Sequence, residues 1–200
     1  ANKAYQMVTM VGFRTFIKLL KNSAGAHASF HEPFREAASY GTSVLEQTLE
    51  MSSHEFSVEE INKNLGLKIT VRYFTVPGEP LSVLARELSL ENISGAPLEL
   101  ELLDGLPSVN PYGMNEFFVK NMSRTIEAWM VTENVYKKKA PFFRLRVDAT
   151  DRSEGTAIEE GNFYFSCLEE KKAKPRLLDP IVDPAKIFGI QSVLAREPLE

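Results

Sequence analysis

Hydrophobic and polar residues alternate along much of this chain. In residues 97–104 leucines at every second position are separated by glutamates, and residues 69–74 show the same period of two. This spacing is typical of antiparallel strands that bury one face of a sheet. The sequence therefore predicts an all-β fold that is mainly antiparallel.

Short turn motifs separate the predicted strands. Residues 64–66, 77–80 and 94–97 contain glycines and prolines, which set the backbone angles that tight turns require. Turns of this length join neighbouring strands into a meander. The four strands expected to pair in this order are residues 54–62, 67–74, 81–94 and 97–104.

The remaining segments complete the predicted layout. Residues 124–135 are expected to pair with residues 142–147 through a lysine-rich turn, and residues 162–168 alternate again. One short helix is predicted near residues 115–123, with Asn115 as its N-cap. At the start of the chain, Gly12 divides two expected strands. Residues 22–42, rich in Ala, Ser and Gly, predict a loop.

The composition and net charge of the chain argue against some classes of function. The chain of 200 residues has a net charge of −4, which argues against a nucleic-acid or anionic-membrane surface. It is long enough for one domain over residues 1–200, and no long apolar run or basic leader is visible, so a cytoplasmic protein is expected. Cys167 is the single cysteine, and alternation with Phe163 and Phe165 predicts that it is buried.

Catalytic and metal-binding motifs are absent from the sequence. His27 and His31 have i, i+4 spacing, but Gly25 and Pro33 disfavour a helix there and no third ligand follows, so we expect no metal. Paired glutamates such as residues 59–60 point to opposite faces of a strand, which predicts solvated strand edges and not a two-carboxylate site. We therefore expect no catalytic residue and no cofactor.

One stretch combines aromatic rings with hydrogen-bonding side chains. Between residues 101 and 129 the alternation breaks at a turn, and a polar and aromatic cluster follows. Sugars are bound by such mixtures, with ring faces on aromatic side chains and hydroxyls on amides and guanidinium groups. A packed corner between strands is the structural alternative. The candidate carbohydrate-facing residues are Asn110, Tyr112, Asn115, Arg124 and Trp129.

Six segments of the chain form a recognisable set: NKAYQMVTMVGFRTFIK, HEPF, KITVRYFTVPGEPLSVLARELSLENIS, GLPSVNPYG, KNMSRTIEAWM and IVDPAKIFG. Together they resemble the N-terminal region of the cellobiose phosphorylase family, and most closely its long members such as β-1,2-oligoglucan phosphorylases. The resemblance spans nearly the whole chain, from about Asn2 to Gly189.

The resemblance implies a galactose-mutarotase-like β-supersandwich that precedes a helical catalytic barrel. In that family the barrel carries the catalytic acid and the site for inorganic phosphate, the co-substrate, and the sandwich helps to shape the site and the homodimer. No succession of long helices occurs in this sequence, so no catalytic residue is transferred. The chain is then expected to be an incomplete part of a larger enzyme, a noncatalytic sandwich with a helical domain, carbohydrate and a second copy as partners.

Two alternatives stay open. The chain could be a free-standing carbohydrate-binding module that uses Tyr112 and Trp129 as contacts. It could also be a mutarotase-like sugar epimerase, which needs a His or Glu acid–base set in a sheet concavity. Three histidines scattered along the sequence argue against the epimerase.

Overall fold

Antiparallel strands dominate the structure, as the alternation predicts, and α3 (Ala185–Phe188) is a short helix. The computed structural model describes residues 12–21, 29–35, 44–107, 109, 111–114, 121, 128–148, 153–170 and 173–189. The chain divides into two compact units, and each is considered by itself. We call Arg14–Gly105 the sandwich unit, and Ala1–Phe13 with Leu106–Glu200 the second unit.

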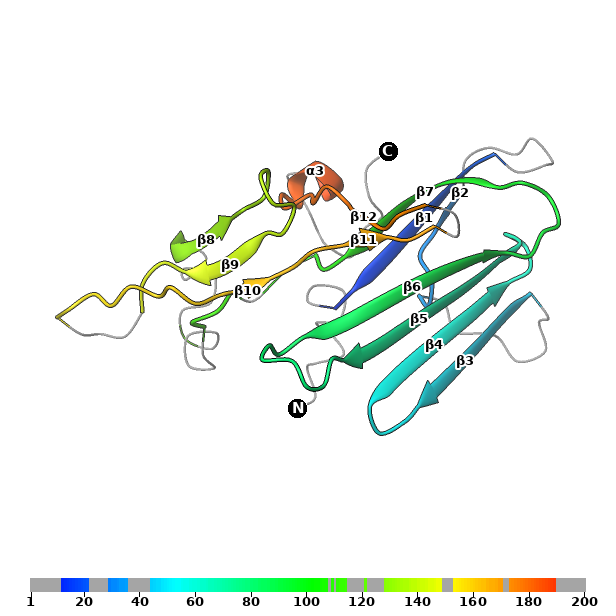
Figure 1. Ribbon diagram of the computed structural model, residues 1–200. Helices are drawn as coiled ribbons and strands as arrows, with labels where there is room; N and C mark the ends of the chain where they lie inside the picture. Colours follow the sequence, from blue (N-terminus) through cyan, green and yellow to red (C-terminus); the bar gives the residue numbers. More distant parts are fainter. Residues whose placement is uncertain are drawn as a thin grey trace. The chain divides into compact units, whose positions relative to one another are not determined.

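The sandwich unit consists of two antiparallel sheets (Figure 1). One sheet has the order β3-β4-β5-β6 and the other has the order β2-β1-β7. The seven strands are β1 (Arg14–Lys21), β2 (Ser29–His31), β3 (Leu45–Met51), β4 (Glu55–Asn62), β5 (Leu67–Thr75), β6 (Leu84–Asn92) and β7 (Glu99–Gly105).

The predicted meander is right for three strands and wrong for the fourth. β4, β5 and β6 pair in sequence order, but β7 leaves this sheet and pairs with β1, where Ile17 lies opposite Leu102. The crossing places Leu98 and Leu100 against the cluster of buried side chains that β1 and β5 form. β3, a strand that the sequence pattern did not predict, pairs with the other side of β4.

A small apolar core joins the two sheets. Ile17 and Leu19 of β1 form one buried cluster with Leu67 and Ile69 of β5. Each side chain of this type stabilises the fold by about 1.5–3 kcal/mol when it is fully buried. The inner face of the four-stranded sheet is apolar at β5, but the residue opposite Ile69 on β4 is Glu60, and that position is also buried.

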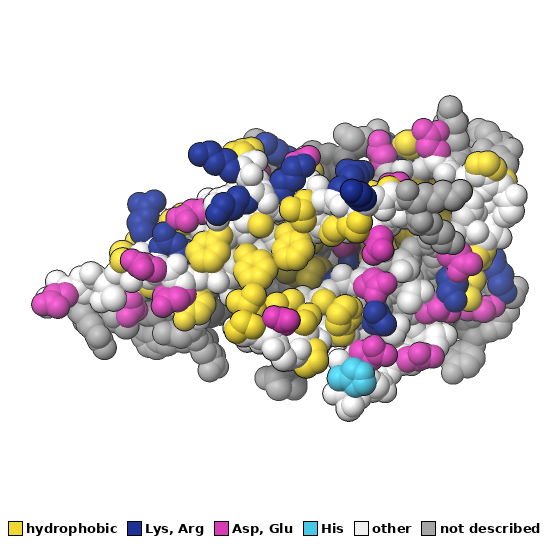
Figure 2. Space-filling view, viewed as in Figure 1, with side chains coloured by type: hydrophobic (Ala, Val, Ile, Leu, Met, Phe, Trp, Pro, Cys, Tyr) yellow, Lys and Arg dark blue, Asp and Glu magenta, His cyan; other side chains and the backbone are white. Residues whose placement is uncertain are grey.

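The outer face of the same sheet is charged. Lys68 lies 2.8 Å from Glu59, and Arg72 lies 2.8 Å from Glu87, with all four side chains at least partly exposed. Figure 2 shows acidic and basic side chains mixed over the region of β4 to β6. Exposed ion pairs of this kind contribute about 0–1 kcal/mol each to the free energy of unfolding. Most of the stability of the sandwich unit therefore comes from its buried side chains.

The second unit contains short strands. Met130 lies opposite Leu145, which confirms the predicted pairing of residues 124–135 with 142–147. Leu145 is fully buried against Met114, Met130 and Ile158. The strands are β8 (Met130–Glu133), β9 (Phe142–Leu145), β10 (Asn162–Phe163), β11 (Cys167–Leu168) and β12 (Arg176–Leu177).

Two further expectations are corrected. Cys167 was predicted to be buried but is exposed, because the face that it shares with Phe163 and Phe165 is the exposed one, and the residues between them are partly buried. Within the predicted loop 22–42, residues Ser29–His31 form β2. Most of the predicted helix 115–123 and the strand expected before Gly12 lie outside the described residues. Among those described, no helix has the length and apolarity that a membrane crossing requires.

Candidate functional site

The structure describes two of the five residues predicted to face carbohydrate. The backbone oxygen of Tyr112 accepts a hydrogen bond from the Leu145 amide (2.8 Å), and that of Trp129 accepts one from the Arg146 amide (2.9 Å). Strand β9 and the residue after it thus hold both aromatic residues, and both side chains are exposed. The remaining candidates, Asn110, Asn115 and Arg124, lie outside the described residues.

Exposed apolar side chains are the main surface feature of the second unit. Phe163 and Phe165 stack with their ring centroids 6.1 Å apart and their planes 9° apart, yet 45% and 52% of these residues remain exposed. Figure 2 shows hydrophobic side chains gathered over the region of β9 to β11. The other large apolar residues exposed in this unit include Tyr136, Leu177, Ile181 and Val182.

The sandwich unit contains a histidine–carboxylate pair in which the carboxylate is buried and the histidine is partly buried. The Nε2 atom of His31, on β2, lies 2.5 Å from Oε1 of Glu60, on β4, so the pair connects the two sheets. Oε2 of Glu60 accepts hydrogen bonds from the Phe34 amide (2.8 Å) and from Nε2 of Gln47 (3.0 Å). Both carboxylate oxygens therefore have partners, which is the condition for burying such a group at modest cost.

These contacts determine the charge state of Glu60. Burial raises the pKa of the carboxyl group, but hydrogen bonds from His31, Phe34 and Gln47 outweigh this effect and lower the pKa below the ordinary value of 4.5. Glu60 is therefore an ionised acceptor with filled oxygens. It is not a free acid that could protonate a glycosidic oxygen.

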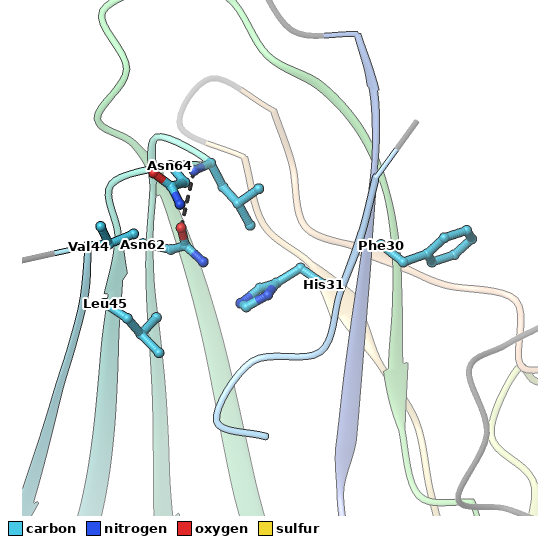
Figure 3. A pocket seen from close by; sticks show the side chains of 7 residues that line it. Phe30, His31, Val44, Leu45, Asn62 and Asn64 are labelled. Carbon is cyan, nitrogen blue, oxygen red and sulfur yellow. Dashed lines mark hydrogen bonds between the residues drawn. The ribbon is translucent and has the colours of Figure 1, made fainter. Parts of the chain in front are cut away.

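A small pocket of about 200 Å³ lies beside this pair. In Figure 3 the His31 ring and the Asn62 amide point toward one another, whereas Phe30 points away. Asn62 is buried on β4, and its Oδ1 atom accepts a hydrogen bond from the Leu65 amide (3.1 Å). The residues that line the pocket are Phe30, His31, Val44, Leu45, Asn62, Asn64 and Leu65.

A second polar cluster connects the sheets near the end of β7. Arg86 on β6 donates hydrogen bonds to Asp104, to the Thr15 hydroxyl (2.8 Å) and to the Tyr73 hydroxyl (3.0 Å). Thr15 in turn donates to Asp104 (2.6 Å). The side chain of Arg86 is 7% exposed, so this cluster is a structural connection and presents no open surface.

The burial of Glu60 and its contact with His31 were not predicted from the sequence. The pair 59–60 was predicted to be solvated, which holds for the partly exposed Glu59 but is wrong for Glu60. The available signal was the phase of β4, because Glu60 and Asn62 share a face with Val58 and lie opposite the buried Ile69 and Leu67. His31 could not be linked to them, since its strand is only three residues long.

The remaining histidine and acidic residues that the structure describes do not indicate a further site. In the described part of the chain, no group of three or more His, Cys, Asp or Glu residues is placed to hold a metal ion. His54 lies in the exposed turn between β3 and β4, near the Ser53 hydroxyl. No protein-family model matches this sequence, and no curated protein is similar to it.

Proposed function

We propose that this chain is the noncatalytic sandwich region of a cytoplasmic carbohydrate phosphorylase. In this proposal it packs against a helical catalytic domain of the same protein and supports a homodimer. The complete protein would use inorganic phosphate to cleave a β-glucoside disaccharide or oligoglucan. The proposal combines the resemblance of the sequence segments with the surface and the buried chemistry of the described residues.

The observation that carries the proposal is the exposed apolar surface of the second unit. Phe163 and Phe165 are stacked on one another, so their rings are held in place while about half of each residue faces solvent. Large exposed apolar surface on a folded protein marks a place where another protein surface binds. A helical domain with an apolar face would cover it.

The two acids that lie between the sheets of the sandwich unit support a noncatalytic role. Inverting cleavage needs a carboxylic acid that can give its proton to the leaving oxygen inside an open pocket. Glu60 keeps its negative charge and its oxygens are occupied by three donors. Asp104 is bonded to Thr15 and Arg86. Neither group offers the proton that such a reaction requires.

A supporting role in sugar contact is consistent with the second unit. Tyr112 and Trp129 are held by backbone hydrogen bonds to consecutive residues of the β9 segment, and both side chains are exposed. Aromatic rings that are fixed and accessible can stack on the C–H face of a sugar. In the proposal they line the edge of a site whose chemistry is supplied by the catalytic domain.

An activity assay tests the noncatalytic assignment. The purified 200-residue chain is incubated with inorganic phosphate and either cellobiose or a β-1,2-linked gluco-oligosaccharide, and glucose 1-phosphate is measured. We expect no release above the blank, because the proposal places the catalytic acid and the phosphate site in the helical domain. Release that depends on both phosphate and the chain would refute the assignment.

A further inference from the structure

We propose that the pocket beside His31 binds a neutral polyhydroxylated molecule of monosaccharide size. One hydroxyl of this ligand is held between the His31 ring and the Asn62 side-chain amide. The site belongs to the sandwich unit alone, so the inference does not depend on the phosphorylase proposal. It rests on two polar atoms of the pocket that have no hydrogen-bond partner among the described residues, and on the charges of the residues around them.

The first atom is the free ring nitrogen of His31. Because the Glu60 carboxylate only accepts hydrogen bonds, the ring nitrogen beside it, Nε2, must carry a proton. In the neutral ring Nδ1 is then an acceptor. Within the described residues Nδ1 has no hydrogen-bond partner, and it belongs to a residue that lines the pocket. Glu60 thus orients the ring and fixes which nitrogen is available.

The second atom is Nδ2 of Asn62. The oxygen of this amide is used by the Leu65 backbone amide, at 3.1 Å, which determines the orientation of the side chain. The nitrogen then faces the His31 ring, as Figure 3 shows, and it has no partner in the described part of the chain. A donor and an acceptor that face one space match a hydroxyl group, which accepts from one and donates to the other.

The charge distribution selects a neutral ligand. The lining residues include no Lys, Arg, Asp or Glu, and the negative Glu60 lies directly behind His31. An anion would therefore be repelled. A cation would find both carboxylate oxygens already occupied by donors. The apolar side chains of Leu45 and Leu65 fit the C–H surface of a sugar-like molecule.

The volume limits the size of the ligand. The pocket measures about 200 Å³. Sites for drug-sized ligands measure about 300–1,000 Å³. A single sugar ring is the appropriate size, and it could be a free monosaccharide or the terminal ring of an oligosaccharide. The chemistry recognised is the same in both cases, so the experiment has to separate them.

Nuclear magnetic resonance titration of the full chain tests the proposal, with D-glucose and cellobiose as probes and inorganic phosphate as the anionic comparison. We expect the signals of the Asn62 side-chain amide and the His31 ring to shift in a saturable manner with a sugar. Stronger binding of glucose than of cellobiose would indicate a free monosaccharide, and the reverse a terminal ring. Phosphate should leave these signals unchanged.

Two variants separate ligand binding from folding. His31→Gln keeps a donor toward Glu60 but removes the ring acceptor, so sugar binding should weaken about tenfold or more. Leu45→Trp fills the pocket from β3 and leaves His31 and Glu60 in place, and it should abolish the shifts. His54→Gln, in the exposed turn, is the matched control and should bind like the unchanged chain.

Three results would overturn the inference. The first is the absence of saturable shifts at Asn62 and His31 with both sugars. The second is unchanged sugar binding in Leu45→Trp or in folded His31→Gln. The third is a stronger response of the same signals to phosphate. None of these results would bear on the phosphorylase proposal, whose assay measures glucose 1-phosphate.

Discussion

Replacing Arg86 by methionine should lower the free energy of unfolding by about 3–5 kcal/mol. The guanidinium group connects β6 to the other sheet through Asp104 and Thr15, and it is nearly inaccessible to water. Methionine retains an unbranched apolar side chain, so the main loss is the cation. Asp104 would then keep its negative charge without the cationic partner that offsets its desolvation.

Arg72→Met is the matched control for this measurement. Arg72 lies on the outer face of the same sheet, and its side chain is 46% exposed beside Glu87 and Glu55. Its removal should change the free energy of unfolding by no more than about 1 kcal/mol. Urea denaturation of the three proteins supplies the comparison. Equal losses in both variants would show that the cross-sheet cluster does not hold the sandwich together.

Glu60→Gln should lower the free energy of unfolding by about 3 kcal/mol at neutral pH. The carboxylate accepts hydrogen bonds from His31, Phe34 and Gln47, and a neutral amide cannot accept from all three because one end is a donor. In the variant the NH2 group of the glutamine amide therefore faces at least one hydrogen-bond donor that the carboxylate had accepted from. Denaturant titration of both proteins at pH 7 measures the loss.

The same variant has a defined pH dependence. The pKa of Glu60 is lower in the folded chain than its ordinary value of 4.5. Its stabilising contribution is therefore complete above the unfolded pKa and is lost as the pH falls through the folded pKa. The stability difference between the unchanged chain and Glu60→Gln should shrink below about pH 4.5.

Glu59→Gln, one residue earlier on the outer face, is the control for this pH dependence. Its carboxylate forms a partly exposed pair with Lys68, so its removal should cost about 1 kcal/mol or less. If the stability difference for Glu60→Gln were independent of pH, the charged state assigned to Glu60 would be wrong.

The alternation of hydrophobic and polar residues predicts which face of a strand is buried better than it predicts which strand pairs with it. Ile69, Val71 and Tyr73 were predicted to share one face of a strand, and Ile69 and Val71 are buried while Tyr73 is partly buried. The same pattern in residues 97–104 does not say which strand lies alongside, and β7 pairs with β1 from the beginning of the unit. Pairing across such a distance depends on how the whole core closes, which a local pattern does not contain.

The candidate site at His31 and Glu60 was harder to predict from the sequence than the fold. His31 and Glu60 are 29 residues apart and lie on different sheets, so no spacing rule connects them. Adjacent glutamates suggest a solvated edge, and only the register with Ile69 shows that Glu60 faces inward. The predicted cluster of Tyr112 and Trp129 was found from composition, and the structure describes both side chains as exposed.

The most direct test of the proposed role compares one double variant, Phe163→Ser with Phe165→Ser, in two settings. In the isolated chain both residues are about half exposed, so the free energy of unfolding should change by about 0.5 kcal/mol or less for each. In the protein expressed from the complete reading frame we expect a clear fall in the unfolding temperature and in phosphorolysis, because the proposed function places both rings against the helical domain. An unchanged unfolding temperature and activity in that protein would contradict the account.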